Sequence, residues 1–379
     1  AAYKNDALFP ENAADGTMVQ SGSVALDPTT GGVQALVGRR GEHVFRGFNF
    51  ATQMKRSPGS TIKPISVYAP AIEAGYNPDS ILEDKPQSYY EAKNYDGTYS
   101  GEVPMYQALA QSLNLPAVWT LHEIGLDRGY KKTQAFGLTL TDSDKYWGLA
   151  LGGLENGESP LTMAAAYGVF ASGGYYYQPH LITKIVDSTG AVIVDNTSVK
   201  GKQVISKETA DKMTSMMLGT FSNGTGVSAS PYGFTIAGKT GTTETNFDLS
   251  KVNDQWIVGY TPDLVISTWL GFEQTSAEHY LTGTSGQVVG KIFKAEAESL
   301  LPYSQGSQFQ VADAYQTGGK LMAADEVPDS NDSTNNDDWK KSVDDFAENA
   351  KEGLKDFGER VKQGTKELFG NLWNTINGN

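Results

Sequence analysis

Cysteine is absent from this chain of 379 residues, and histidine is scarce. The lack of cysteine excludes disulfides, thiolate metal sites and a cysteine nucleophile. The four histidines are His43, His122, His180 and His279, and no two of them have the spacing of a metal-binding motif such as HExxH. We therefore expect neither a bound metal ion nor any other cofactor.

Long hydrophobic runs and an excess of positive charge are missing as well. No apolar run approaches the roughly 20 residues that a membrane-spanning helix needs, and no signal peptide begins the chain. Lys and Arg number 30 against 44 Asp and Glu, which gives a net charge of -14 and argues against nucleic-acid binding. Because the chain starts at Ala1 without an initiator methionine, we expect a fragment or a processed form of a longer protein.

Strand and helix signals alternate along the chain, with strands expected near both ends of one large domain. A helix is predicted at 207–219, with Ser206 as its N-cap, and another at 290–300. The short Thr-Pro-Asp connection at 261–263 makes the strands on either side of it antiparallel neighbours. The predicted strands are 19–26, 33–37, 181–187, 191–194, 234–240, 254–260 and 264–272, and helical periodicity occupies much of 60–175.

Four segments differ in composition. Residues 1–17 are small and polar and predict a linker from a missing N-terminal region, whereas 18–302 form the main domain. Residues 303–338 predict a C-terminal extension that ends in an acidic linker. The tail 339–379 has apolar residues at steps of three and four, broken by glycines, and is predicted to be an amphipathic helix or disordered.

The first motif with chemical meaning has Ser60 three residues before Lys63, after a Pro-Gly pair typical of a turn into a helix. Residues three apart share one helix face, so the hydroxyl and the amine can meet. A serine hydroxyl needs a base, and Lys63 is the candidate because histidine is scarce. Lys63 must be neutral for this task. Burial and a second cation such as Lys239 would lower its pKa from about 10.4.

The second motif is the triplet at 112–114, where Ser112 and Asn114 lie between two helical segments. A loop with these side chains can relay a proton to a leaving amine and hold a peptide amide. On its own, a Ser-x-Asn triplet is more often an ordinary polar turn before a helix. The triplet supports a catalytic interpretation only in combination with the other two motifs.

The third motif consists of Lys239, Thr240, Gly241 and Thr242 and is expected at the end of an apolar strand. Gly241 would let a substrate backbone approach closely, and the strand edge can bind an extended peptide as an added strand. Lys239 and the two threonines can hold a terminal carboxylate. The backbone amides of Thr242 and Ser60 are candidate donors to an oxyanion.

A competing pattern overlaps this motif, because 233–240 also fits the P-loop sequence G-x-x-x-x-G-K-[ST]. A P-loop follows an apolar strand and begins a helix. Here 228–232 make a poor strand and 241–246 a poor helix start. We reject nucleotide binding as the main interpretation and keep a P-loop nucleotide-binding protein as a distant alternative.

In this order the three motifs resemble the S-x-x-K, S-x-N and K-T-G signature of penicillin-binding proteins. The resemblance to the class A, bifunctional members covers about 18–300. Its most specific segment is Arg-Ser-Pro-Gly-Ser-Thr-Ile-Lys-Pro, which resembles their nucleophile segment. The segments that carry the resemblance are 56–64, Gly152-Gly153, 161–167 and 237–243.

The resemblance implies an α+β fold with a predominantly antiparallel sheet flanked by helices, a helical subdomain and a site in the cleft between them. It also implies a D,D-transpeptidase that cross-links peptidoglycan stem peptides. Ser60 would attack the penultimate D-Ala carbonyl, expel the terminal D-Ala and pass the acyl group to a neighbouring amine. β-Lactams would mimic the D-Ala-D-Ala end and acylate Ser60.

Partners and location follow from the same resemblance. Stem peptides, β-lactams and other cell-wall synthesis proteins are the expected partners, and nucleic acid is not. We expect the extracytoplasmic face of the bacterial cell membrane, reached through an N-terminal anchor that this chain lacks. We recognise no glycosyltransferase domain in the chain and assign no glycan polymerisation to it.

Several related functions stay open at this point. A D,D-carboxypeptidase, a β-lactamase or a β-lactam sensor of the same fold would share Ser60 and Lys63, and a non-catalytic wall-binding module would keep the fold without needing Ser60. Leu113 stands where class A β-lactamases have Asp, which favours a penicillin-binding protein. The rate of deacylation would separate a β-lactamase from a transpeptidase or a sensor.

Overall fold

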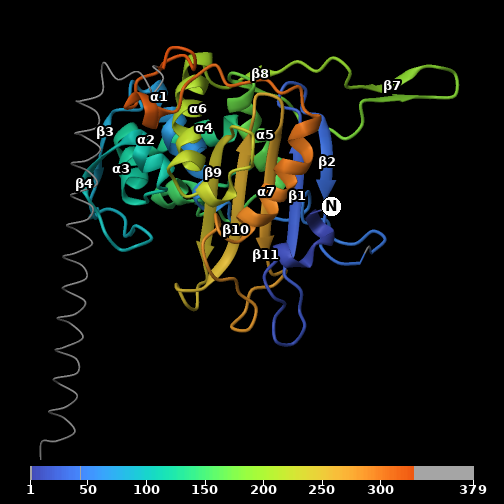
Figure 1. Ribbon diagram of the computed structural model, residues 1–379, viewed down its shortest axis with the longest axis horizontal. Coiled ribbons are helices and arrows are strands. Elements are labelled where there is room, and N and C mark those ends of the chain that lie inside the picture. The colour runs from blue at the N-terminus through green and yellow to red at the C-terminus, as the bar shows by residue number, and fades with distance from the viewer. Residues whose placement is uncertain (1, 43, 328–379) are drawn as a thin grey trace, which may run out of the picture. The chain divides into compact units, whose positions relative to one another are not determined.

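A five-stranded antiparallel sheet forms the centre of the computed structural model, which describes residues 2–42 and 44–327 (Figure 1). The strand order is β2-β1-β11-β10-β9, so β9 is an edge strand and the N-terminal hairpin lies beside β11. These strands are β1 (Gln20–Leu26), β2 (Val33–Val37), β9 (Ala237–Glu244), β10 (Val252–Tyr260) and β11 (Val265–Gly271).

Helices cover both faces of the inner strands, because side chains along a strand point alternately to opposite faces. On one face Trp256 and Val258 belong to a hydrophobic cluster that includes α5 (Pro160–Ala171) and α6 (Lys207–Ser222). On the other face Ile257 packs with residues of α7 (Val289–Leu300). Figure 1 shows α7 in front of the sheet and α5 behind it.

A helical subdomain lies beside the edge strand β9 (Figure 1). It contains the chain from Gly59 to Leu151 and a small antiparallel hairpin, and α6 packs against two of its helices. Its elements are η3 (Gly59–Ile62), η4 (Pro64–Tyr68), α1 (Ala69–Glu73), β3 (Ile81–Asp84), β4 (Gly101–Pro104), α2 (Met105–Ala110), α3 (Leu115–Ile124), α4 (Leu126–Ala135), η5 (Asp142–Asp144) and η6 (Trp147–Leu151). The α+β class with a helical subdomain is thereby confirmed.

Elements that were predicted from a capping residue or a short connection agree with the structure. The helix α6 begins after Ser206, whose hydroxyl accepts a hydrogen bond from the Thr209 amide at 3.0 Å. The strands β10 and β11 are antiparallel neighbours. The predicted strand at 234–240 is wrong in its limits, because β10 ends at Tyr260, opposite Ala237, and residues before Ala237 have no partner there. The strand β9 instead runs through the third motif to Glu244.

The N-terminal residues pack on the domain more closely than the expected linker would. They form η1 (Ala2–Lys4) and η2 (Asp6–Leu8), and Phe9 is buried in the cluster beneath α7. The first part of the C-terminal extension, which includes η8 (Leu301–Tyr303) and α8 (Ala314–Thr317), also folds on the domain. The rest of the predicted acidic linker, 328–338, and the tail 339–379 lie outside the described residues.

The hairpin predicted near 181–195 is confirmed as β6 (Lys184–Val186) and β7 (Val192–Asp195), and it projects from the body of the domain (Figure 1). The remaining elements are β5 (Tyr175–Tyr176), β8 (Lys202–Gln203) and η7 (Val227–Ala229). Within 2–42 and 44–327, no helix has the length and apolarity to cross a membrane.

Candidate active site

Ser60 lies at the start of a continuous helical stretch made of η3, η4 and α1. The chain turns into it at Gly59, whose φ of 52° is in the left-handed region that glycine tolerates. A Cβ atom on Gly59 would lie 2.8 Å from the Thr242 carbonyl oxygen. The turn therefore brings Ser60 directly against the edge strand β9.

A cavity of about 500 Å³ brings the three predicted motifs together. It lies between η3, the loop before α3 and the edge strand β9. The predicted residues that line it are Ser60, Ser112, Asn114, Thr240, Gly241 and Thr242. The two predicted lysines, Lys63 and Lys239, do not line it and are fully buried.

Lys63 points toward the loop of the second motif. Its Nζ donates to the carbonyl oxygens of Ser112 and Leu113 at 2.7 and 3.0 Å and to Asn114 Oδ1 at 2.6 Å. Among the described residues, the hydrogen bonds of Lys63 Nζ go to this loop, and none goes to the Ser60 hydroxyl. Burial, and next the charge of Lys239, hold the pKa of Lys63 well below its usual value.

The sequence predicted Lys239 at the end of a strand. In the structure Lys239 lies within β9, which continues beyond it to Glu244. Its Nζ donates to the Thr240 carbonyl oxygen at 3.0 Å. Burial lowers the pKa of Lys239 to about 7. Burial thus shifts both amines toward their neutral forms.

The loop with Ser112 is strained and tightly held. Ser112 has a φ of 59°, an unusual value for a residue other than glycine that costs about 1–3 kcal/mol. Asn114 accepts the Lys63 hydrogen bond and donates its Nδ2 to the Lys93 carbonyl oxygen at 2.7 Å. The Asn114 side chain therefore orients Lys63 in this structure, and a substrate amide would have to displace one of these contacts.

Two hydroxyl groups from residues outside the three motifs contact β9 where that strand lines the cavity. The Thr240 hydroxyl contacts Thr225 Oγ1 at 2.6 Å, and the Thr242 hydroxyl contacts Ser285 Oγ at 2.6 Å. Ser285 also donates to the Gly241 carbonyl oxygen at 2.5 Å. Thr225 and Ser285 both line the cavity, and sequence reasoning missed them because only the fold brings them to β9.

Asn94 is a second group that the sequence did not indicate. Its Oδ1 accepts hydrogen bonds from the Asn114 and Leu115 amides at 2.8 and 3.2 Å. Its Nδ2 donates to Asp84 Oδ1 at 2.7 Å, at the end of β3. Asn94 therefore fixes the start of α3, and with it the loop that contacts Lys63.

The P-loop alternative is wrong. The Gly-Lys-Thr triplet at 238–240 lies within a continuous strand, β9, which is paired with β10 on both sides of the triplet. A P-loop would need a helix to begin at this point. The lysine is buried beneath the cavity instead of standing at a helix N-terminus.

Comparison with known proteins agrees with this arrangement. Residues 22–296, well over half of the chain, match the family model described as the penicillin-binding protein transpeptidase domain. The chain belongs to this family. The matched region of the transpeptidase domain includes all three motifs.

The chain is 50% identical over 324 residues to penicillin-binding protein 2a of Streptococcus pneumoniae, and the match covers 84% of the chain and 44% of that protein. It is 42% identical over 269 residues to penicillin-binding protein 1F of Bacillus subtilis, with coverage of 70% and 37%. The chain thus spans less than half the length of these relatives.

Solved structures share the fold. The penicillin-binding protein PonA1 of Mycobacterium tuberculosis aligns with a TM-score of 0.71 at 24% identity, covering 85% of this chain and 87% of that chain. A structure of PonA1 in complex with penicillin V aligns with a TM-score of 0.70, covering 84% and 87%. At this identity the likeness shows the transpeptidase fold.

Proposed function

We propose that this transpeptidase domain forms an acyl-enzyme on Ser60 and acts as a D,D-transpeptidase on peptidoglycan stem peptides. The observation that carries the proposal is the cavity in which Ser60 faces the edge strand β9 above two buried lysines with lowered pKa values. Family membership and the penicillin V complex of PonA1 support it. β-Lactams would acylate the same hydroxyl.

The first half of the reaction forms the acyl-enzyme. Neutral Lys63 takes the Ser60 proton as Ser60 Oγ attacks the penultimate D-Ala carbonyl. The backbone amides of Ser60 and Thr242 stabilise the oxyanion, and Lys239 with its neighbouring threonines holds the terminal carboxylate. As the C–N bond breaks, the proton passes to the leaving D-Ala amine by way of Ser112.

The second half transfers the acyl group. An amine of a neighbouring stem peptide attacks the acyl carbon, its proton returns through Lys63, and Ser60 leaves with its hydroxyl restored. The edge position of β9 supports this step, because an extended peptide can bind there as an added strand. A carboxypeptidase would use water instead of the amine, and a β-lactamase would deacylate quickly.

The setting of this reaction is also part of the proposal. The domain would act at the extracytoplasmic face of the bacterial membrane through a preceding anchor, together with other cell-wall synthesis proteins. Its relatives are more than twice as long as the part that this chain matches, so further domains of the whole protein would supply these attachments.

Intact mass after incubation with a penicillin tests the assignment. We expect a one-to-one covalent adduct that disappears in Ser60→Ala, because the proposal assigns the acylated hydroxyl to Ser60. His279→Gln is the matched control. His279 pairs with Asp15 at 2.9 Å and does not line the cavity, so the adduct should form at the wild-type rate.

An adduct that survives Ser60→Ala would contradict the proposal. A stem-peptide donor with a labelled amine acceptor then separates the related activities. A cross-linked product indicates transpeptidation, release of D-Ala alone indicates a carboxypeptidase, and hydrolysed penicillin in excess over protein indicates a β-lactamase.

A further inference from the structure

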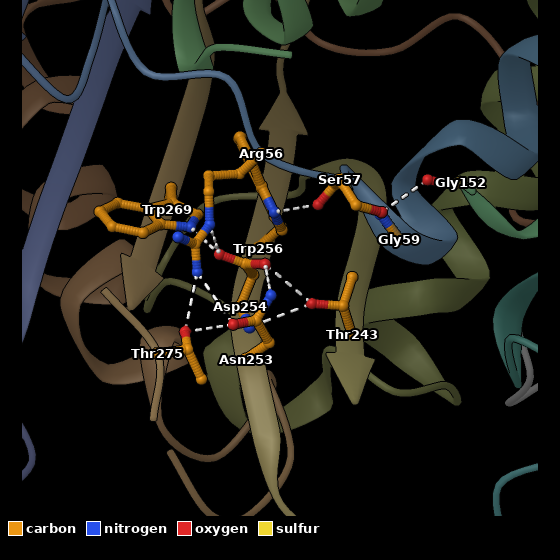
Figure 2. Close-up of polar contacts among 10 residues, drawn as sticks. All are labelled: Arg56, Ser57, Gly59, Gly152, Thr243, Asn253, Asp254, Trp256, Trp269 and Thr275. Atoms are coloured by element: carbon orange, nitrogen blue, oxygen red, sulfur yellow. Dashed lines mark hydrogen bonds and ion pairs between the residues drawn. The ribbon is translucent and has the colours of Figure 1, made fainter. Parts of the chain in front are cut away.

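Arg56 stands four residues before Ser60 and is the centre of a polar network beside the site (Figure 2). Its Nε donates to Asp254 Oδ1 at 2.7 Å. Its Nη2 donates to Asn253 Oδ1 at 3.0 Å and to Thr275 Oγ1 at 3.1 Å. One planar guanidinium thus holds three groups at once, which a lysine ammonium cannot reproduce in the same geometry.

Asp254 is the partner on the sheet, and its side chain is 0% exposed. Besides Arg56, its Oδ1 accepts from Trp269 Nε1 at 2.9 Å, and its Oδ2 accepts from Thr243 Oγ1 at 2.9 Å. Asn253 Nδ2 donates to the same Oδ2 at 2.8 Å. The buried carboxylate therefore has four donors and is stable only while these partners stay in place.

The network sits at a β-bulge between the strands β9 and β10. Val252 pairs with Glu244 and Asp254 pairs with Thr243, so Asn253 is the extra residue. A bulge bends its strand and redirects nearby groups, and it often lies beside an active site. Thr243 makes two hydrogen bonds to the bulge. Its hydroxyl donates to Asp254 Oδ2 and accepts from the Asp254 amide at 3.1 Å.

The segment between Arg56 and Ser60 is held against both strands. Trp256 Nε1, on β10, donates to the Ser57 carbonyl oxygen at 2.9 Å. The Ser57 hydroxyl donates to the Gly152 carbonyl oxygen at 2.5 Å (Figure 2). On β9, a Cβ atom on Gly241 would lie 2.6 Å from the Pro58 carbonyl oxygen, so the two backbones are in contact.

We propose that Arg56 and Asp254 are positioning residues for acylation. With Thr243 they form a latch, the Arg56 latch, that fixes the Ser60 amide relative to the Thr242 amide next to Thr243. The inference rests on the proposed function, in which these two amides share one oxyanion. The donors sit on different elements, and the latch joins those elements through side chains.

The latch predicts a loss confined to the chemical step. Arg56→Lys keeps the charge but loses the planar guanidinium with its three contacts. Thr243→Val keeps Arg56 and Asp254 and the backbone pairing of β10 with β9, but it removes the hydrogen bonds of the Thr243 hydroxyl to Asp254. Each should lower the acylation rate constant k2 about 10- to 100-fold, because misplacement of about 1 Å has effects of this size. The penicillin Kd before acylation should change less than about threefold, since Lys239, Thr240 and Thr242, which are proposed to hold the carboxylate, are unchanged.

Stopped-flow acylation with a fluorescent penicillin separates k2 from Kd, and thermal unfolding shows that each variant is folded. Glu73→Gln is the matched control, because it breaks the part-buried Lys132–Glu73 ion pair of 2.7 Å in the same domain, away from the cavity. It should lower thermal stability and leave k2 at the wild-type value. The double variant of Arg56→Lys and Thr243→Val should lose no more than the worse single variant, since both open one latch.

Wild-type k2 in folded Arg56→Lys and Thr243→Val would overturn the inference, as would losses that multiply in the double variant. A higher Kd at constant k2 would also overturn it. The proposed function is tested separately in the same samples. If wild-type protein forms no adduct on Ser60, the proposed function fails, whereas a wild-type adduct with unaffected variants removes the latch alone.

Discussion

At the scale of single residues, two amines are buried beside a cavity that opens to solvent. An ammonium group loses its hydration on burial, so each lysine is pushed toward its neutral form. Their surroundings differ, however. Lys63 faces three oxygen atoms of the loop before α3, whereas Lys239 donates to the Thr240 carbonyl oxygen. Three acceptor oxygens favour the ammonium form of Lys63, whereas burial and the charge of Lys239 favour the neutral form that the proposed base needs.

The pH dependence of acylation should therefore depend on Lys239. Lys239 is cationic below its pKa of about 7 and neutral above it, so k2/Kd for a penicillin with a carboxylate should fall as the pH rises through about 7. Lys239→Arg should abolish this fall, because guanidinium stays charged to above about pH 12. Labelling rates measured from pH 6 to pH 9 test this, and the same fall in the Arg variant would contradict it.

At the scale of elements, the contact between η3 and β9 is a backbone contact. Gly241 was expected to make room for substrate, and the structure adds a requirement within the protein itself. A Cβ atom at 241 would lie 2.6 Å from the Pro58 carbonyl oxygen and 2.9 Å from Thr61 Cγ2. The edge strand β9 and the helix that carries Ser60 can meet this closely only because position 241 lacks a side chain.

Gly241→Ala should therefore push the two elements apart. We expect it to destabilise the domain by about 1–3 kcal/mol, as overpacking does, and to slow acylation of the folded protein. Gly168→Ala in α5 is the control, because its nearest neighbours would be 3.8 Å away and alanine favours a helix. Denaturant unfolding and penicillin labelling test both. Unchanged acylation in folded Gly241→Ala would contradict the expected displacement.

Elements with a local signal were predictable from the sequence. The Ser206 cap marked the start of α6, and the short connection at 261–264 made β10 and β11 neighbours. The limits of β9 were not predictable, because its pairing partner sets them. The three motifs, taken together and in their order, predicted residues that line one cavity, Ser60, Ser112, Asn114, Thr240, Gly241 and Thr242. Ser285 and Asn94 were missed because each reaches the site through a distant segment, and nothing in its sequence neighbours shows that.

At the scale of the whole molecule, Glu296 links pH to stability. It lies on α7, nearly buried, and its Oε2 accepts a hydrogen bond from Thr268 Oγ1 at 2.5 Å. Burial raises the pKa of Glu296 from 4.5 to about 7. Between these values the folded protein keeps a proton that the unfolded chain releases. The stability that this group contributes is therefore complete at low pH and falls as the pH rises to about 7.

Glu296→Gln should remove this dependence, because an amide does not ionise. We expect the variant to be more stable than wild type by on the order of 3 kcal/mol at pH 8 and nearly equal to it at pH 4. Chemical unfolding at several pH values measures the difference. Glu298→Gln, half-exposed on the same helix, is the control and should change stability little at either pH. An equal gain at both pH values would contradict the assignment.

The strand order has a consequence for how the chain is made. The strand β1 is complete at Leu26, yet one of its two neighbours, β11, begins only at Val265. During synthesis one edge of the hairpin of β1 and β2 therefore stays unpaired until β11, more than 220 residues further along the chain, has emerged. A chain that ends between Glu244 and Val265 contains all three motifs but cannot complete the sheet. Penicillin labelling would then report that translation has passed this point, and not merely that the serine codon has been read.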